Sequence, residues 1–122
     1  MSIYQENILE HYRHPRNYGR LAAATDRVTV ANPLCGDVIC LEALIKKRIL
    51  WEVRFSGEGC AISTAAASML TEKAHRRRLK PLLGLTKNDM LKMLGIELSP
   101  NRLKCALLPW EALLKLIGNG KY

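Results

Sequence analysis

Two apolar segments joined by a short basic tip constrain the fold of this chain more than any other feature. The tip (Lys46, Lys47 and Arg48) separates residues 37–45 (DVICLEALI) from residues 49–55 (ILWEVRF). The later segment alternates strictly, with one side formed by Leu50, Glu52 and Arg54 and the other by Ile49, Trp51, Val53 and Phe55. A period of two is typical of a half-buried β-strand. The pattern therefore predicts an antiparallel hairpin with one buried face.

The residues before this hairpin predict one more strand and one helix. Residues 27–31 (RVTVA) are rich in β-branched side chains, as short strands are. Residues 2–13 begin with a serine that can cap a helix, and they carry apolar side chains at helical spacing. Pro15 follows directly and should end this helix.

The residues after the hairpin predict further helices. An alanine- and serine-rich helix is expected over residues 61–77, packed closely on the sheet, and a short helix over residues 86–95. Residues 98–104 (LSPNRLK) are expected to be irregular. The last helix would then begin at Cys105, since this places Pro109 in its first turn rather than in its interior.

This order of elements, together with the composition, indicates a single α+β domain over residues 1–122. We expect a three-stranded antiparallel sheet with the N-terminal helix and the C-terminal helices packed on one face. No apolar run reaches the ~18 residues of a membrane span, and the N-terminus lacks the pattern of a secretory signal. We therefore expect a cytoplasmic protein. Its four cysteines should stay reduced and serve metal or thiol chemistry rather than disulfides.

The net charge of +8 requires a separate explanation. Basic residues cluster at 46–48, the expected hairpin tip, and at 76–78, the expected end of a helix. Aromatic residues make up only 6% of the chain and none lies within either cluster, so there is no platform on which bases could stack. A solvated surface or a docking patch for an acidic protein is favoured, and a nucleic-acid binder is the weaker alternative.

Three cysteines occupy similar positions at the edges of expected elements. Cys35 precedes a strand, Cys60 follows a glycine turn and opens a helix, and Cys105 opens the last helix. The first turn of a helix favours a thiolate, which is the form that binds metals and attacks sulfur. These thiols could therefore converge on one metal site, although three buried structural cysteines would explain the same positions. The chain has no C-x-x-C pair, so zinc-finger spacing is absent.

A closed tetrahedral site needs a fourth ligand, and both Asp37 and Cys40 are candidates. In an extended segment Asp37 points to the same side as Cys35, whereas Cys40 points to the other. Strand geometry therefore favours Asp37, for which the alternative role is a turn-forming aspartate after a glycine. A carboxylate holds soft metals less tightly than a thiolate does, so such a site should open readily. More remote candidates, each expected at the surface, are His11, His14 and His75.

Several motifs give the chain a resemblance to a known family. ILEHYRHPRNYGRL (8–21), NPLCGD (32–37), FSGEGCAIS (55–63) with ASMLTE (67–72), and RLKCALLPWEAL (102–113) occur in this order. Together they resemble the iron–sulfur cluster assembly scaffolds of the IscU/SufU/NifU N-terminal family over nearly the whole chain. The resemblance implies a SufE/NifU-like fold. It also implies that the metal or cluster ligands are Cys35, Asp37, Cys60 and Cys105.

The resemblance further implies how such a protein acts. It would accept persulfide sulfur on Cys105 from a PLP-dependent cysteine desulfurase and assemble or relay a [2Fe-2S] cluster for apo iron–sulfur acceptor proteins. The alternative is a zinc-dependent sulfur carrier that uses the same four ligands with Zn²⁺. Arg102 and Lys104 would contact the desulfurase or hold the persulfide charge. The chain is either a non-catalytic scaffold or a sulfurtransferase-type acceptor, and a structural zinc module is a third, weaker hypothesis.

The branch within this family is indicated by two departures. Lys104 stands where the IscU branch usually has histidine, and residues 98–102 (LSPNR) differ from the motif that this branch offers to a DnaK-like chaperone. A contact with such a chaperone is therefore not favoured. RLKC followed by Trp110 is similar to the SufU branch, although the interval between Cys60 and Cys105 leaves no room for the segment usually inserted there. The chain most resembles a compact SufU-type protein.

Overall fold

The computed structural model describes residues 3–34 and 36–118. Four antiparallel strands form one sheet in the order β1-β2-β3-β4. They span β1 (Asp26–Asn32), β2 (Asp37–Lys46), β3 (Ile49–Glu58) and β4 (Arg77–Arg78). The helices are α1 (Ile3–Arg13), α2 (Ala61–Ala74), α3 (Leu79–Leu83), α4 (Lys87–Leu94) and α5 (Pro100–Ile117). The α+β class is confirmed, whereas the expected number of three strands is wrong.

The fourth strand lies where the end of a helix was expected. α2 ends at Ala74 rather than near residue 77, and Arg76 adopts a left-handed conformation with φ of 60° that turns the chain back toward the sheet. The Arg76 N–H then donates to the Leu50 carbonyl at 2.8 Å, and β4 pairs with the start of β3. Such a two-residue strand has no sequence periodicity, so only tertiary hydrogen bonding defines it.

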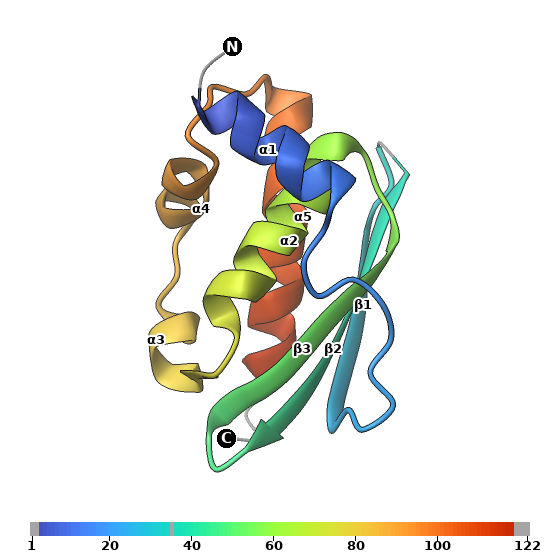
Figure 1. Cartoon of the computed structure of the whole chain (residues 1–122), viewed down its shortest axis with the longest axis vertical. Coiled ribbons are helices and arrows are strands. Elements are labelled where there is room, and N and C mark those ends of the chain that lie inside the picture. The colour runs from blue at the N-terminus through green and yellow to red at the C-terminus, as the bar shows by residue number, and fades with distance from the viewer. Residues whose placement is uncertain (1–2, 35, 119–122) are drawn as a thin grey trace.

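The two long helices cover one face of the sheet (Figure 1). α2 packs against β3, and α5 packs against β1 and β2. Alanines at positions 65, 66 and 67 of α2 are fully buried, as the expected close packing of this helix requires. Their small side chains let the helix backbone approach its neighbours, and larger leucines from α5 and β2 fill the space that remains. No helix in the described ranges is both long and apolar enough to cross a membrane.

The alternation expected in β3 breaks at Trp51. Leu44 pairs with Glu52 and Ile45 pairs with Leu50, so Trp51 is the extra residue of a β-bulge. Leu50 is consequently buried in the core, whereas Trp51 is 41% exposed. A bulge changes which face each side chain takes, and strict alternation therefore assigned the wrong face to the start of this strand.

A loop covers part of the opposite face of the sheet, where β2 carries a buried acid. The Glu42 side chain is only 1% exposed; it accepts a hydrogen bond from Arg27 Nε at 2.7 Å and another from Arg20 of the loop over residues 14–25. Burial raises the pKa of Glu42, but the hydrogen bonds from Arg27 and Arg20 outweigh it and hold this pKa below its usual value. The ionised carboxylate thus ties the loop and β1 to β2.

The last helix begins earlier than expected. α5 starts at Pro100, and Ser99 caps it by accepting the Arg102 N–H at 3.5 Å. Serine followed by proline is a strong helix start. This start prevails over the preference of Pro109 for a first turn, so residues 100–104 are helical and Pro109 lies in the helix interior. The pyrrolidine nitrogen of Pro109 has no hydrogen to donate to the carbonyl four residues earlier, which is that of Cys105.

A buried histidine joins α1 to α2, contrary to the surface position expected for it. His11 is 5% exposed, and its Nδ1 lies 2.7 Å from Ser68 Oγ. The backbone N–H of Arg16 donates to the same oxygen at 2.8 Å. Burial, and next the nearby charge of Arg16, lower the pKa of His11 below 6.5, against weaker opposing effects of nearby acids. The ring is therefore neutral at pH 7, and its Nδ1 shares a hydrogen bond with the Ser68 hydroxyl.

We expect the folded chain to lose stability as the pH falls below about 6.5, the ordinary pKa of histidine. In that range the unfolded chain binds a proton at position 11 that the folded chain resists, because the charge would be buried beside Arg16. Urea unfolding followed between about pH 8 and about pH 5 measures the effect. His11→Gln should flatten the slope, whereas His14→Gln, at an exposed position, should not. Equal slopes for the two variants would contradict this assignment.

Candidate metal centre

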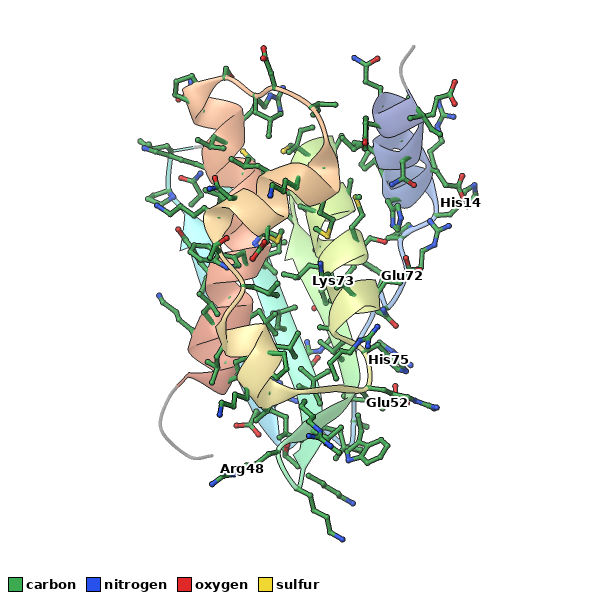
Figure 2. The ribbon with its side chains drawn as sticks, turned by 90° about the vertical axis from the view of Figure 1, so that its left-hand side faces the viewer. His14, Arg48, Glu52, Glu72, Lys73 and His75 are labelled. Atoms are coloured by element: carbon green, nitrogen blue, oxygen red, sulfur yellow. The ribbon has the colours of Figure 1, made fainter. Side chains whose placement is uncertain are left out.

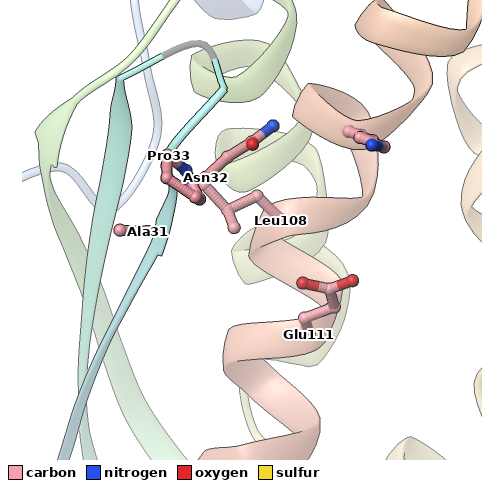
Figure 3. A pocket seen from close by; sticks show the side chains of 6 residues that line it. Ala31, Asn32, Pro33, Leu108 and Glu111 are labelled. Atoms are coloured by element: carbon pink, nitrogen blue, oxygen red, sulfur yellow. The ribbon is translucent and has the colours of Figure 1, made fainter.

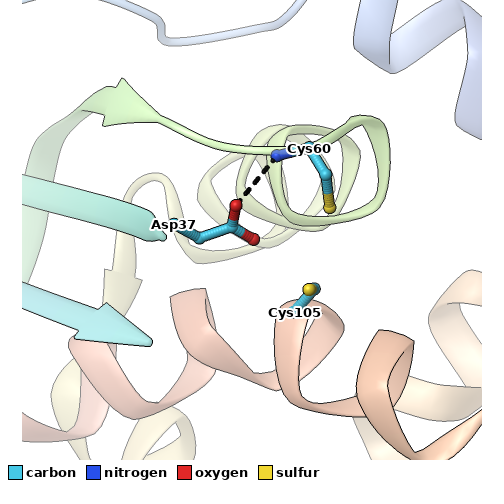
Figure 4. A group of neighbouring side chains, drawn as sticks. All are labelled: Asp37, Cys60 and Cys105. Carbon is cyan, nitrogen blue, oxygen red and sulfur yellow. Dashed lines mark hydrogen bonds between the residues drawn. The ribbon is translucent and has the colours of Figure 1, made fainter. Parts of the chain in front are cut away.

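Three potential ligands from separate elements converge at one end of the molecule. They are Asp37 at the first residue of β2, Cys60 immediately before α2, and Cys105 in α5. One carboxylate oxygen and the two sulfurs all lie within 4.8 Å of one another (Figure 4). A separation of this size is typical of ligands around a single ion, because each lies about 2.0–2.3 Å from it.

Asp37 contributes one oxygen to the fold and presents another to the centre. The residue is 5% exposed, and its Oδ1 accepts the backbone N–H of Cys60 at 3.2 Å (Figure 4). Its Oδ2 is buried and has no hydrogen-bond partner among the described residues. A buried polar atom without a partner is costly, and a bound cation would remove that cost. The donor set of one hard oxygen and two soft sulfurs fits zinc or iron.

Cys60 is placed by the start of α2. It is the N-cap residue, with extended φ and ψ of −74° and 175°, and its Sγ accepts the Ser63 N–H at 3.5 Å. The exposed N–H groups of a first helical turn favour a negatively charged atom at this position. The prediction that Cys60 opens this helix is confirmed. Ser63 ends the FSGEGCAIS motif, and its role follows from its place three positions after the N-cap.

Two glycines hold Cys60 close to Asp37. A Cβ on Gly57, whose φ is +123°, would lie 2.0 Å from the Val38 carbonyl oxygen. A Cβ on Gly59 would lie 2.2 Å from the hydroxyl oxygen of Ser63. Gly57, which lies within β3, depends on glycine because the clash is with backbone, whereas the Ser63 hydroxyl beside Gly59 belongs to a side chain that can rotate. Neither residue stood out as functional in the sequence beyond marking a turn.

Cys105 reaches the centre from inside a helix, not from a helix start as predicted. It lies in the second turn of α5 and is 3% exposed. The two residues proposed for partner contact, Arg102 and Lys104, precede it on the same helix, and both are exposed. Because this approach segment is helical, the sulfur is held at a fixed position relative to Cys60.

The remaining cysteines occupy different situations. Cys35 lies outside the described residues, between Leu34 and Gly36, whose N–H groups bond to the Asn32 side chain and carbonyl at 3.1 and 2.9 Å. Cys40 points away from the centre, because it alternates with the buried residues of β2 and is half-buried on the opposite face. The opposite orientations of Asp37 and Cys40 agree with the strand-parity argument.

Two hollows lie beside Lys104 of α5. A hollow of about 270 Å³ is lined by Ala31, Asn32, Pro33, Lys104, Leu108 and Glu111 (Figure 3). A second hollow of about 290 Å³ is lined by Asn32, Leu34, Asn101 and Lys104. Both lie between the end of β1 and α5, next to the segment that carries position 35. Asp37, Cys60 and Cys105 line neither hollow, but Lys104, which lines both, directly precedes Cys105 in α5.

Comparison with known proteins identifies the family. The model of the NifU-like N-terminal domain matches residues 3–121. This chain belongs to that family. The zinc-dependent sulfurtransferase SufU of Bacillus subtilis (strain 168) is 35% identical over an alignment that covers 93% of this chain and 88% of SufU. The iron–sulfur cluster assembly scaffold protein IscU 1 of Archaeoglobus fulgidus is 30% identical over 94% of this chain and 74% of IscU 1.

A solved structure of the family supports the same fold. The N-terminal part of a nitrogen-fixing NifU-like protein from Brucella abortus superposes with a TM-score of 0.78. The superposition covers 95% of this chain and 92% of that structure at 20% identity. The family expected from the sequence motifs is thus confirmed. The alignment with SufU runs over 133 positions, more than the 122 residues of this chain, so SufU has residues without a counterpart here.

Proposed function

We propose that this chain is an iron–sulfur cluster assembly protein. It accepts persulfide sulfur from a PLP-dependent cysteine desulfurase and assembles or relays a [2Fe-2S] cluster for apo acceptor proteins. The proposed ligands are Asp37, Cys60 and Cys105, with Cys35 as the fourth. The observation that carries the proposal is the convergence of three ligand atoms within 4.8 Å, one of them on a carboxylate with an unpartnered buried oxygen. The proposed location of this chain is the cytoplasm, where thiols stay reduced.

The first step uses Cys105 as the nucleophile. Its thiolate attacks the outer sulfur of the desulfurase persulfide, the sulfur–sulfur bond of that persulfide breaks, and the desulfurase thiolate leaves. One sulfur atom is transferred, and the negative charge passes from the attacking to the leaving thiolate. The exposed side chains of Lys104 and Arg102 lie on the approach to Cys105 and attract this charge or acidic groups of the desulfurase.

Asp37 gives the centre its capacity to release cargo. A carboxylate binds iron and zinc less tightly than a thiolate does, so the aspartate is the ligand that exchanges first. Its other oxygen accepts the Cys60 N–H, which keeps the carboxylate in place while the bond to the metal opens. The centre is therefore suited to holding a cluster for a time and passing it on.

A zinc-dependent sulfur carrier is the second candidate, and the 35% identity to SufU favours it. Bound Zn²⁺ would keep the cysteine thiols deprotonated while protecting them from oxidation. The same four residues would hold it, and Cys105 would leave the metal to take sulfur when the desulfurase docks. Lys104 in place of a histidine also fits this candidate.

Metal and acid-labile sulfide analysis tests the proposal. The chain is purified without oxygen and then incubated with a cysteine desulfurase, cysteine and ferrous iron. A thiol reductant in the mixture supplies the electrons that convert the persulfide sulfur to sulfide. We expect a brown protein that contains equal amounts of iron and sulfide and absorbs visible light. A colourless protein with one zinc and no sulfide would favour the sulfur carrier instead. A chain that holds neither metal would contradict both functions.

A further inference from the structure

The positive charge of this chain is concentrated in two segments. Residues 43–51 and 73–88 contain nine of the 19 basic residues and none of the 11 acidic ones. The rest of the chain carries ten basic residues against eleven acidic, so it is close to neutral. The net charge of +8 therefore belongs almost wholly to these two segments, and none of the proposed metal ligands lies in either.

The fold joins these segments at the end of the molecule opposite the metal centre. β4 pairs with the start of β3, and the Leu79 N–H donates to the Arg48 carbonyl at 3.0 Å. β2 begins with Asp37 at the centre and ends with Lys46 nine residues later, a distance of about 30 Å along an extended strand. Figures 1 and 2 show the hairpin tip with Arg48 at this far end.

A groove lies between the two segments. Its volume is about 590 Å³, and it is lined by Lys47, Arg48, Ile49, Arg78, Leu79, Lys80 and Leu83. We call these seven residues the basic groove. Four of them are basic and three are aliphatic, and Leu83 is 47% exposed although its side chain is large and apolar. Charged and apolar surface are thus available together, as at the core and rim of a protein interface.

The basic side chains here are not explained by folding alone. Lys47 and Arg48 have φ of 53° and 62°, a turn conformation in which asparagine and glycine are the favoured residues. Arg76 has a similar φ of 60°. Within the described residues, no basic side chain of either segment forms an ion pair. The three glutamates that border the segments, Glu42, Glu52 and Glu72, pair with arginines outside them. Long cations occupy strained positions without an internal partner, which indicates an external one.

We propose that the basic groove binds an acidic segment of a partner protein that inserts an apolar side chain beside Leu79 and Leu83. Charge complementarity selects an acidic partner, and the aliphatic lining selects a protein over a nucleic acid, because no aromatic side chain lines the groove for base stacking. Since the groove lies about 30 Å from Asp37, this partner can bind while the metal centre stays accessible to another protein. The inference stands independently of the function proposed for that centre.

Fluorescence anisotropy tests the groove with a defined probe. The probe is a labelled synthetic peptide with a glutamate-rich face and two leucines one helical turn apart. We expect the full chain to bind it more tightly than a matched peptide in which both leucines are glutamine, and more tightly than single-stranded or duplex DNA. Binding should weaken as salt is added, because the opposing charges become screened.

Matched variants separate the groove from general attraction by net charge. R78Q/K80Q should weaken peptide binding about tenfold, and L83Q should weaken it severalfold without a change in charge. R13Q/K92Q removes two exposed charges elsewhere and should change binding less than about twofold. Equal losses in the two double variants, tighter binding of DNA, or no binding of the leucine peptide at low salt would each overturn the proposal. The metal content of all variants should equal that of the parent chain, whichever metal it carries.

Discussion

Replacing Cys105 with serine is expected to abolish persulfide formation on this chain and to weaken metal binding by more than about tenfold. A serine hydroxyl is neither a thiolate nucleophile nor a soft ligand, so both proposed roles of this residue are lost together. The substitution is nearly isosteric at a position that is 3% exposed, and α5 should therefore still form. Transfer of labelled sulfur from cysteine through a desulfurase provides the measurement.

Cys40→Ser is the matched control for this experiment. Cys40 is half-buried on the opposite face of β2, so its replacement should leave sulfur uptake and metal content nearly unchanged. Mass spectrometry of the labelled protein then locates the added sulfur. Normal uptake by the Cys105 variant would contradict both the scaffold and the sulfur-carrier function. Loss of uptake in the Cys40 variant would show instead that the chemistry is not confined to the proposed centre.

The second large effect is expected for Gly57→Ala, which should destabilise the fold by about 2–5 kcal/mol and disrupt the metal centre. The added Cβ would lie 2.0 Å from the Val38 carbonyl oxygen, and φ of +123° is unfavourable for alanine. Relief of the overlap separates β3 from β2 at the residue next to Asp37. Because Cys60 follows three positions later, its contact with the Asp37 carboxylate should loosen.

Gly19→Ala separates these two causes. Gly19 has a similar φ of +132°, but a Cβ there meets no atom within 4 Å. The Gly19 variant should therefore lose only about 1–2 kcal/mol of folding stability, from backbone strain, and its metal content should stay unchanged. Thermal unfolding gives the stabilities, and we expect the Tm of the Gly57 variant to fall by about 10 °C or more. If the two variants lose equal stability, the close approach of Gly57 to β2 is not what holds this end of the sheet.

Sequence patterns predicted the regular helices and strands, but they did not predict the elements whose position depends on tertiary contacts. Alternation and turn residues located three strands and the start of α4, where Thr86 and Asp89 form a capping box. The bulge at Trp51 was missed because one extra residue leaves no trace in a short periodic pattern. β4 was missed because two residues carry no period, and the helix start at Ser99 was missed because Pro109 was given more weight than the Ser-Pro pair.

Only part of the metal centre could be predicted from local sequence patterns. Parity along β2 distinguished Asp37 from Cys40, because alternation is a local property of a strand. The convergence of Asp37 with Cys60 and Cys105 depends on the packing of α5 against α2 and the sheet, which no local pattern reports. The motifs shared with the family supplied that long-range information. The basic groove was invisible for the same reason, since its halves are about thirty residues apart along the chain.

The placement of Cys105 in the last helix also sets the order of events during synthesis. A ribosome makes a chain from its N-terminus, and three of the proposed ligands, Cys35, Asp37 and Cys60, emerge well before α5 does. Until α5 docks, these residues form an incomplete set of ligands. The proposed site therefore lacks its sulfur acceptor, Cys105, through most of synthesis. The centre becomes competent only once α5 has docked and the core around it has closed.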